Sequence, residues 1–177
     1  MSDLLRVADV ADRELAWAQA SFTRQEFALT AQGAAVGRLA FPGMLGTLAE
    51  GATGDGAWTF KRVGFWQQRA TVRARGSEAD LAVFQNNTWK GGGTLDFIEG
   101  SRFRATTNFW NTRFLWQTEE EQTLLEFHHG GAFKLSSTVE IEERARALPQ
   151  LPLLVLFGWY LCVMLHRDAG AHVAIVG

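Results

Sequence analysis

Hydrophobic and polar side chains alternate along most of this chain with a period of about two residues. Residues 66–75 are the clearest case, because Ala70, Val72 and Ala74 alternate with arginine and threonine. A period of two is typical of a β-strand with one buried face and one solvated face. The same pattern predicts about twelve strands between residues 14 and 141, with turn residues between them. These strands are expected at residues 16–22, 25–30, 35–41, 44–50, 57–63, 66–75, 79–85, 93–98, 101–107, 113–118, 122–127 and 134–141.

One late segment breaks this pattern. Residues 151–165 read LPLLVLFGWYLCVML, an uninterrupted apolar run. Such a run can span a membrane, anchor the chain to a lipid surface, or form a helix that the sheet encloses. Fifteen helical residues are roughly 22 Å long, shorter than the bilayer hydrocarbon of about 30 Å. A helix that is apolar on every side is typical of burial on every side. Pro152 suits a first helical turn, so we expect a buried helix over residues 151–166 and a solvated tail over 167–177.

Strand number and helix diameter agree with each other. Twelve strands, about 4.8 Å apart and tilted by about 40°, close at a radius of roughly 12 Å. A helix with its side chains is about 10–12 Å across, so it fits inside such a wall. Small inward residues, such as Ala70 and Ala82, would let the wall approach Phe157 and Trp159. The sequence therefore predicts an all-β fold with one central helix: a closed antiparallel barrel of about twelve strands around a hydrophobic C-terminal helix.

Composition narrows the class of protein. The chain has 177 residues, which favours a single domain over residues 1–177, and its 13 Phe and 7 Trp require a large core. A net charge of −2 argues against general nucleic-acid binding. The single cysteine, Cys162, lies in the apolar run, which fits a reducing compartment. The N-terminal segment is interrupted by four acidic residues, Asp3, Asp9, Asp12 and Glu14, so we expect no signal peptide. We therefore expect a cytoplasmic protein. We also expect the barrel to be a monomer.

The chain resembles the tubby C-terminal-like superfamily in three features. These are the strand series over residues 57–141, the terminal run LPLLVLFGWYLCVML, and the phrase WTFKRVGFW followed by RATVRAR. That group includes tubby, the phospholipid scramblases and the LURP-one-related proteins. The resemblance implies a twelve-stranded barrel around a hydrophobic helix. In relatives of tubby, a basic surface patch binds phosphoinositides. No tubby ligand motif matches this chain residue by residue, and the scramblase cysteine clusters and calcium-binding segment are absent from the sequence.

Basic residues provide the main candidate for a binding site. Several of them should face outward on neighbouring strands and form a positive stripe that holds lipid phosphates. A solvated sheet face with the same arginines is the alternative interpretation. The wider set is Lys61, Arg62, Arg69, Arg73, Arg75, Lys90, Arg102, Arg104 and Arg113. The predicted ligand-binding residues within it are Lys61, Arg69, Arg73, Arg75, Arg102 and Arg104.

Other motifs have alternative interpretations. The segment KGGGT at 90–94 is either a backbone nest for an anion or a flexible hairpin. His128 and His129 lie near Glu126, but adjacent strand residues face opposite sides, so only one imidazole can enter a shared site. We predict no metal and no cofactor. Aromatic pairs at 65–66 and 109–110 suit either a membrane interface or plugs for the barrel ends.

The sequence shows no nucleophile elbow, zinc-ligand spacing or paired catalytic carboxylates, so we do not expect an enzyme. The favoured function is a non-catalytic binding module for anionic phospholipid head groups, cytoplasmic and associated with a membrane surface. One alternative is a tail-anchored membrane protein with a cytosolic β-domain, in which the apolar run spans the bilayer. Another is a protein-interaction domain.

Overall fold

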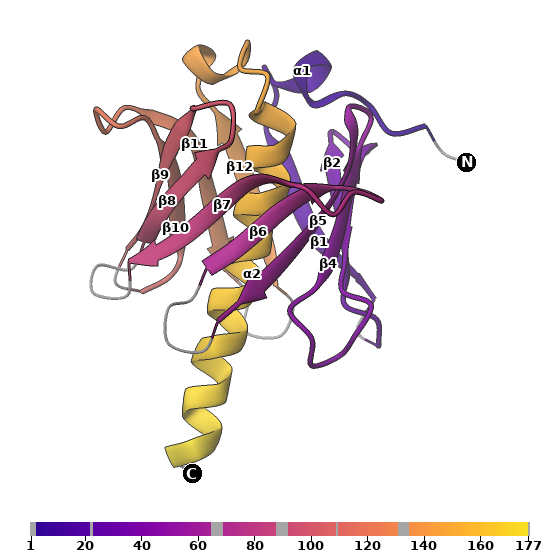
Figure 1. Ribbon diagram of the computed structural model, residues 1–177. Helices are drawn as coiled ribbons and strands as arrows, with labels where there is room; N and C mark the ends of the chain where they lie inside the picture. Colours follow the sequence, from indigo (N-terminus) through magenta and orange to yellow (C-terminus); the bar gives the residue numbers. More distant parts are fainter. Residues whose placement is uncertain are drawn as a thin grey trace.

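A closed antiparallel barrel surrounds a long C-terminal helix, α2 (Leu151–Val176). The computed structural model describes residues 3–21, 23–64, 69–87, 92–108, 110–130 and 135–176, with side chains described as far as residue 171. Figure 1 shows α2 running through the barrel and projecting from its lower end. The predicted fold class is therefore confirmed.

Twelve strands make up the barrel wall within the described chain. Each pairs antiparallel with its neighbours in sequence, and β1 pairs with β12 to close the ring, with Leu15 opposite Val139. Closure leaves no open sheet edge for another chain to pair with. The strands are β1 (Leu15–Ser21), β2 (Glu26–Ala31), β3 (Ala34–Ala40), β4 (Ala49–Thr53), β5 (Gly56–Val63), β6 (Arg69–Ala74), β7 (Asp80–Asn87), β8 (Gly92–Phe97), β9 (Arg102–Thr107), β10 (Arg113–Gln117), β11 (Thr123–Gly130) and β12 (Ser136–Ile141).

The two ends of the barrel differ. The upper end in Figure 1 holds α1 (Val7–Val10), the 3-10 helix η1 (Glu143–Ala145) and the beginning of α2. Because consecutive strands alternate in direction, the upper end also holds the connections at 32–33, 54–55, 75–79, 98–101 and 118–122. The lower end holds the opposite set of connections, including 41–48, and there α2 leaves the barrel.

Aromatic rings fill the space between α2 and the wall. Trp17 on β1 stacks on Trp159 of the helix with ring centroids 5.9 Å apart, and Trp116 on β10 stacks on Phe157 at 6.2 Å. The indole nitrogen of Trp116 donates a hydrogen bond of 2.9 Å to the carbonyl of Leu154. All five side chains are almost fully buried. The apolar run is thus the core of the barrel, as predicted.

The predicted end of the helix was wrong, although burial does end where expected. Side chains are buried up to Met164 and His166 is exposed, yet the helix continues to Val176. Asp168 lies against the lower rim, where Arg62 of β5 forms two hydrogen bonds to its carboxylate at 2.7 and 3.1 Å. This contact holds the helix past the buried segment, so residues 167–176 are not an irregular tail.

The helix is also long and apolar enough to cross a membrane over Leu151–Ala171, but 78% of that segment's apolar window is buried inside the barrel. A tail anchor formed by the same residues would therefore have to leave the barrel and expose its core. The barrel with α2 inside is the arrangement that buries both apolar surfaces at once.

The position of the fourth strand also differs from the prediction. The sequence predicted a strand over 44–50, whereas β4 is Ala49–Thr53 and Met44 is exposed in a loop. Alternation misled the prediction, because the glycines that follow were read as a turn. A Cβ at Gly51 would lie 2.9 Å from Phe60 and 3.3 Å from Leu156. Glycine is needed there because the wall approaches the helix closely, not because the chain turns.

The other predicted strands overlap the observed ones. The expected segments that include residues 22, 66–68 and 134 fall partly outside the described residues. Ala70 and Ala82 face inward and are buried, as expected for small side chains beside the bulky helix.

Candidate functional site

The predicted basic stripe is largely neutralised by carboxylates. Arg73 on β6 pairs with Asp80 at 2.6 Å, and Arg102 on β9 pairs with Asp96 at 2.5 Å. The alternation had correctly placed these arginines outward, but it could not show their partners. The other two pairs are Arg75 with Glu50 at 3.4 Å and Arg104 with Glu121 at 2.7 Å. On this part of the wall, the arginine charges are compensated within the protein.

Lys61 and Arg69 differ from the other predicted ligand-binding residues. Both are exposed, and neither has a carboxylate partner within the described chain. They lie on the paired strands β5 and β6, close to the lower end of the barrel. Of the wider set, Arg62 faces inward and binds Asp168, and Arg113 binds Glu126. Lys90 lies outside the described residues.

The lower end also carries exposed apolar side chains. Met44 is 77% exposed and Leu45 is 98% exposed in the 41–48 loop, and Leu48 and Trp110 are exposed at the same end. Single exposed apolar residues are common, but a group around a projecting helix is typical of an interaction surface. We call this group, together with α2 beyond residue 165, the lower-end surface. Of the aromatic tips predicted at turns, Trp110 lies on it, whereas residues 65, 66 and 109 lie outside the described part.

Arg167 is a residue that the sequence interpretation missed. Its Nη1 donates a hydrogen bond of 3.0 Å to the carbonyl of Gly46, and its guanidinium carbon lies 4.1 Å from the ring centre of Phe41. Its Nε and Nη2 atoms are buried and have no hydrogen-bond partner among the described residues. Desolvation by burial lowers the pKa of this guanidinium. A cation at the end of an apolar run is a known signal for an interfacial position, and it was assigned instead to a solvated tail.

Hydrogen bonds fix the 41–48 loop against the barrel. The hydroxyl of Tyr160 donates a hydrogen bond of 2.7 Å to the carbonyl of Thr47. The hydroxyl of Thr47 in turn donates a hydrogen bond of 3.1 Å to the carbonyl of Arg62. Burial raises the pKa of Tyr160 to about 12, so this phenol stays a donor at neutral pH. The loop therefore presents Met44 and Leu45 from a fixed base.

Charge is distributed unevenly along the barrel axis. At the lower end, the described connections carry Arg24, and α2 beyond residue 165 carries Arg167 and Asp168. The upper end is acidic, because its carboxylates outnumber Arg6, Arg13, Arg75, Arg144 and Arg146. Those carboxylates are Asp3, Asp9, Asp12, Glu14, Asp55, Glu78, Glu99, Glu119, Glu120, Glu121, Glu142 and Glu143. An anionic surface is therefore repelled by the upper end and attracted by the lower end.

A small cavity lies between α2 and the wall at the lower end. It has a volume of about 50 Å³, and its lining includes Phe84, Phe114, Met164, Arg69 and Asp168. Sites for small molecules usually measure about 300–1,000 Å³. This cavity is too small for a substrate or cofactor of ordinary size.

Comparison with known proteins adds no assignment. A scan of family models, a search of curated proteins and a search of solved structures each found no match. Membership of the tubby C-terminal-like superfamily stays a prediction from the layout of the chain. Function has to be inferred from the geometry of the protein itself.

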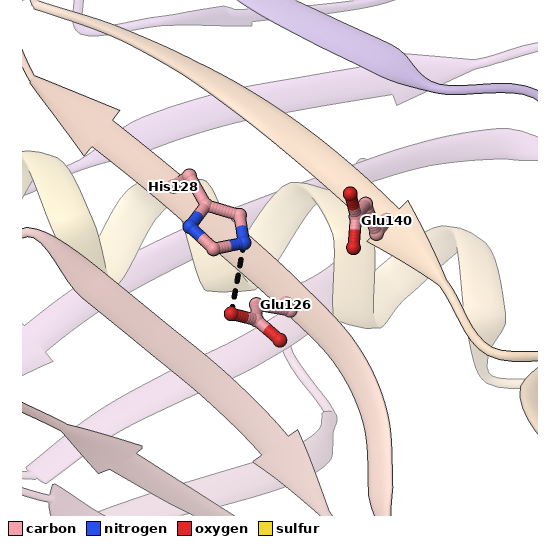
Figure 2. Close-up of side chains that lie close together, drawn as sticks. All are labelled: Glu126, His128 and Glu140. Atoms are coloured by element: carbon pink, nitrogen blue, oxygen red, sulfur yellow. Dashed lines mark ion pairs between the residues drawn. The ribbon is translucent and has the colours of Figure 1, made fainter.

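A second group of polar side chains lies on the outer wall, on β11 and β12. Glu126, His128 and Glu140 point into the same space, as Figure 2 shows, and one ligand atom from each lies within 4.8 Å of the others. His128 Nε2 is 2.8 Å from a carboxylate oxygen of Glu126, which the guanidinium of Arg113 also contacts. Of the two adjacent histidines, only His128 enters this group, as the alternation predicted.

His129 is half-buried on the other side of the strand. Its pKa is lowered, first by burial and then by His166 and His128. In the described part of 90–94, the chain is a paired β-strand rather than a backbone nest. There Gly92 and Gly93 belong to β8, and a Cβ at Gly92 would lie 2.2 Å from the carbonyl oxygen of Ala105. Those glycines allow close strand pairing, and residues 90 and 91 lie outside the described chain.

Proposed function

We propose that this protein is a non-catalytic module that binds anionic phospholipid membranes with its lower-end surface toward the bilayer. One observation carries the proposal: exposed apolar side chains, basic side chains without carboxylate partners, and the projecting helix all gather at the end with few carboxylates. Apolar groups that enter the interface beside cations that meet lipid phosphates are typical of peripheral membrane proteins.

We place the membrane contact at the lower end because carboxylates already pair with the arginines on the barrel wall. Arg73 and Arg102 are occupied by Asp80 and Asp96, so a phosphate would have to displace a carboxylate from each. Lys61 and Arg69 have no such competitor within the described chain. The proposed head-group contacts are therefore Lys61 and Arg69, together with the exposed Arg24 at the same end of the barrel.

Simple magnitudes support reversible binding. Each basic residue near an anionic surface contributes about 1 kcal/mol, so Lys61, Arg69 and Arg24 contribute about 3 kcal/mol at moderate salt. Burial of Met44 and Leu45 adds about 1.5–3 kcal/mol for each side chain if burial is complete. The sum of about 6–9 kcal/mol, before the cost of lost motion, corresponds to weak or moderate affinity. Neither contribution is sufficient alone, so binding should require both anionic lipid and the apolar loop.

The resemblance to the tubby C-terminal-like superfamily agrees with this proposal, since relatives of tubby bind phosphoinositides. The twelve-stranded barrel around a hydrophobic helix is the layout that the resemblance implies. We propose a cytoplasmic protein that associates with membranes as a monomer. Because α2 fills the barrel, the proposed mode is surface binding, with the barrel closed.

Co-sedimentation with vesicles tests the proposal. The full-length protein should bind phosphatidylcholine vesicles that contain phosphatidylserine, bind pure phosphatidylcholine vesicles at least tenfold less, and lose binding as salt rises. Lys61→Glu/Arg69→Glu should weaken binding to the anionic vesicles at least tenfold, because two attractions become repulsions. Met44→Ser/Leu45→Ser should also weaken it, because the apolar contribution is lost.

Matched control variants lie at the upper end. Arg144 and Arg146 are exposed and have no carboxylate partner in the described chain, so Arg144→Glu/Arg146→Glu makes the same change of charge far from the proposed contact. Ile98 is 74% exposed, so Ile98→Ser matches the apolar change. Both controls should bind like the wild type. No binding to any vesicle, equal binding to neutral and anionic vesicles, or an equal loss in the controls would contradict the proposal.

A further inference from the structure

Two carboxylates face each other directly across the β11–β12 pair. Glu126 and Glu140 are register partners, and both project from the outer face of the wall. Like charges directly opposite each other on a sheet are destabilising. Arg113 of β10 compensates Glu126, whereas Glu140 has no ion-pair partner in the described chain. This arrangement leaves a site at which a cation would relieve the repulsion.

An imidazole completes the group. His128 lies two residues after Glu126 on the same strand, so both side chains project from the same face. Its Nε2 atom is directed toward the Glu126 carboxylate, at 2.8 Å from Oε1. The three side chains together offer one nitrogen and two carboxylate donors, whose ligand atoms lie within 4.8 Å of one another (Figure 2).

We propose that Glu126, His128 and Glu140 form a binding site for a divalent transition-metal ion, of which Zn²⁺ is the reference case. Zn²⁺ is bound by imidazole nitrogen and carboxylate oxygen at about 2.0–2.2 Å. Ligand atoms in a tetrahedral set are then about 3.4 Å apart, so the present group, with atoms within 4.8 Å, closes by a small movement of the exposed Glu140 side chain. Water fills the remaining position. Mg²⁺ and Ca²⁺ prefer more oxygen ligands and are not expected here.

The backbone holds these ligands in place. β11 and β12 pair continuously from Leu125 opposite Ile141 to Gly130 opposite Ser136, without a bulge. The inward neighbours Phe127 and Val139 are completely buried, which fixes the strand positions from the inside. A rigid strand pair is a better platform for ligands than a loop, because little order is lost when the ion binds.

Arg113 acts as a competitor within the site. Its Nε atom contacts the same oxygen of Glu126 that faces His128. A metal ion that takes this oxygen must release the guanidinium, while the hydrocarbon part of Arg113 can stay on the wall. Removal of the guanidinium should therefore strengthen metal binding, an outcome not expected for random adsorption to surface carboxylates.

Isothermal titration calorimetry of the full-length protein, without lipid, tests this proposal. ZnCl₂ should bind with one-to-one stoichiometry, and MgCl₂ should give no comparable heat. His128→Ala and Glu140→Gln should each weaken zinc binding at least tenfold, because one of three ligands is lost. Arg113→Met should tighten binding about two- to fivefold, the factor that an exposed ion pair typically carries.

The matched control is His166→Ala, which removes another exposed imidazole from a different element and should leave zinc binding unchanged. Glu140 is exposed, so Glu140→Gln should retain the fold even if His128→Ala does not; circular dichroism checks both variants. No zinc binding, undiminished binding in Glu140→Gln, or loss of binding in His166→Ala would each overturn the proposal. Vesicle binding by the protein has no bearing on these outcomes, so the two proposals can fail separately.

Discussion

Gly158 lies on α2 at a point where the helix packs tightly against the barrel wall. A Cβ at this position would lie 2.6 Å from Cζ of Phe127 and 2.7 Å from Nε1 of Trp116. Both rings are fully buried, and the Trp116 indole is held by its hydrogen bond to the Leu154 carbonyl. Neither ring can move outward without opening the packed layer between helix and wall. We therefore expect Gly158→Ala to destabilise the protein.

Two opposing effects decide the magnitude. In a helix interior, alanine is favoured over glycine by about 0.8–1 kcal/mol. Against this, overpacking of a dense core typically costs about 1–3 kcal/mol. If the Trp116 ring shifts, its buried hydrogen bond is lost at a further cost of about 1–3 kcal/mol. With the hydrogen bond lost, the sum is a net decrease of about 1–5 kcal/mol in the free energy of unfolding, opposite in sign to the helix propensity.

Urea unfolding followed by tryptophan fluorescence measures this difference, because Trp159 of α2 is buried, as are Trp17 and Trp116 on the wall that encloses it. Gly170→Ala is the matched control: it is the same substitution in the same helix, but, apart from the helix backbone around it, no described atom lies within 4 Å of a Cβ at Gly170. The control should leave stability unchanged or raise it by up to about 1 kcal/mol. A Gly158→Ala protein at least as stable as the wild type, or an equal loss in Gly170→Ala, would refute the packing argument.

The thiol of Cys162 and the imidazole of His129 give two further testable predictions. Cys162 is fully buried on α2, and burial raises the pKa of its thiol, so a water-soluble thiol reagent should label it slowly in the native protein and quickly in urea. Fast labelling of the native protein would place this face of α2 outside the barrel. Burial lowers the pKa of His129 below the ordinary value of 6.5, so the unfolded chain takes up a proton first as pH falls below that value, and the free energy of unfolding decreases. His129→Gln should make stability less dependent on pH between 7 and 5; an unchanged pH dependence would contradict this.

The candidate site was only partly predictable from the sequence. Alternation correctly placed Arg73 and Arg102 on the outer face, because the side a strand residue faces is a local property. Charge compensation is not local: Asp80 neutralises Arg73 across the β6–β7 pair, and Asp96 neutralises Arg102 across the β8–β9 pair. Register decides which carboxylate meets which arginine, and a shift of one residue would reverse the faces. The choice between the wall and the lower end thus required the structure.

The sequence by itself determined the barrel and its central helix. A period of two residues, an apolar run of limited length and a strand count that matches the diameter of a helix are all readable without coordinates. Only the tertiary structure decided that β4 is Ala49–Thr53, that α2 continues to Val176, and that Glu126 meets Glu140. The physical reason is the same each time. Periodicity indicates only how each short segment is buried. The three features instead depend on contacts between different segments of the chain. These contacts are Gly51 against the helix, Asp168 against Arg62, and β11 against β12.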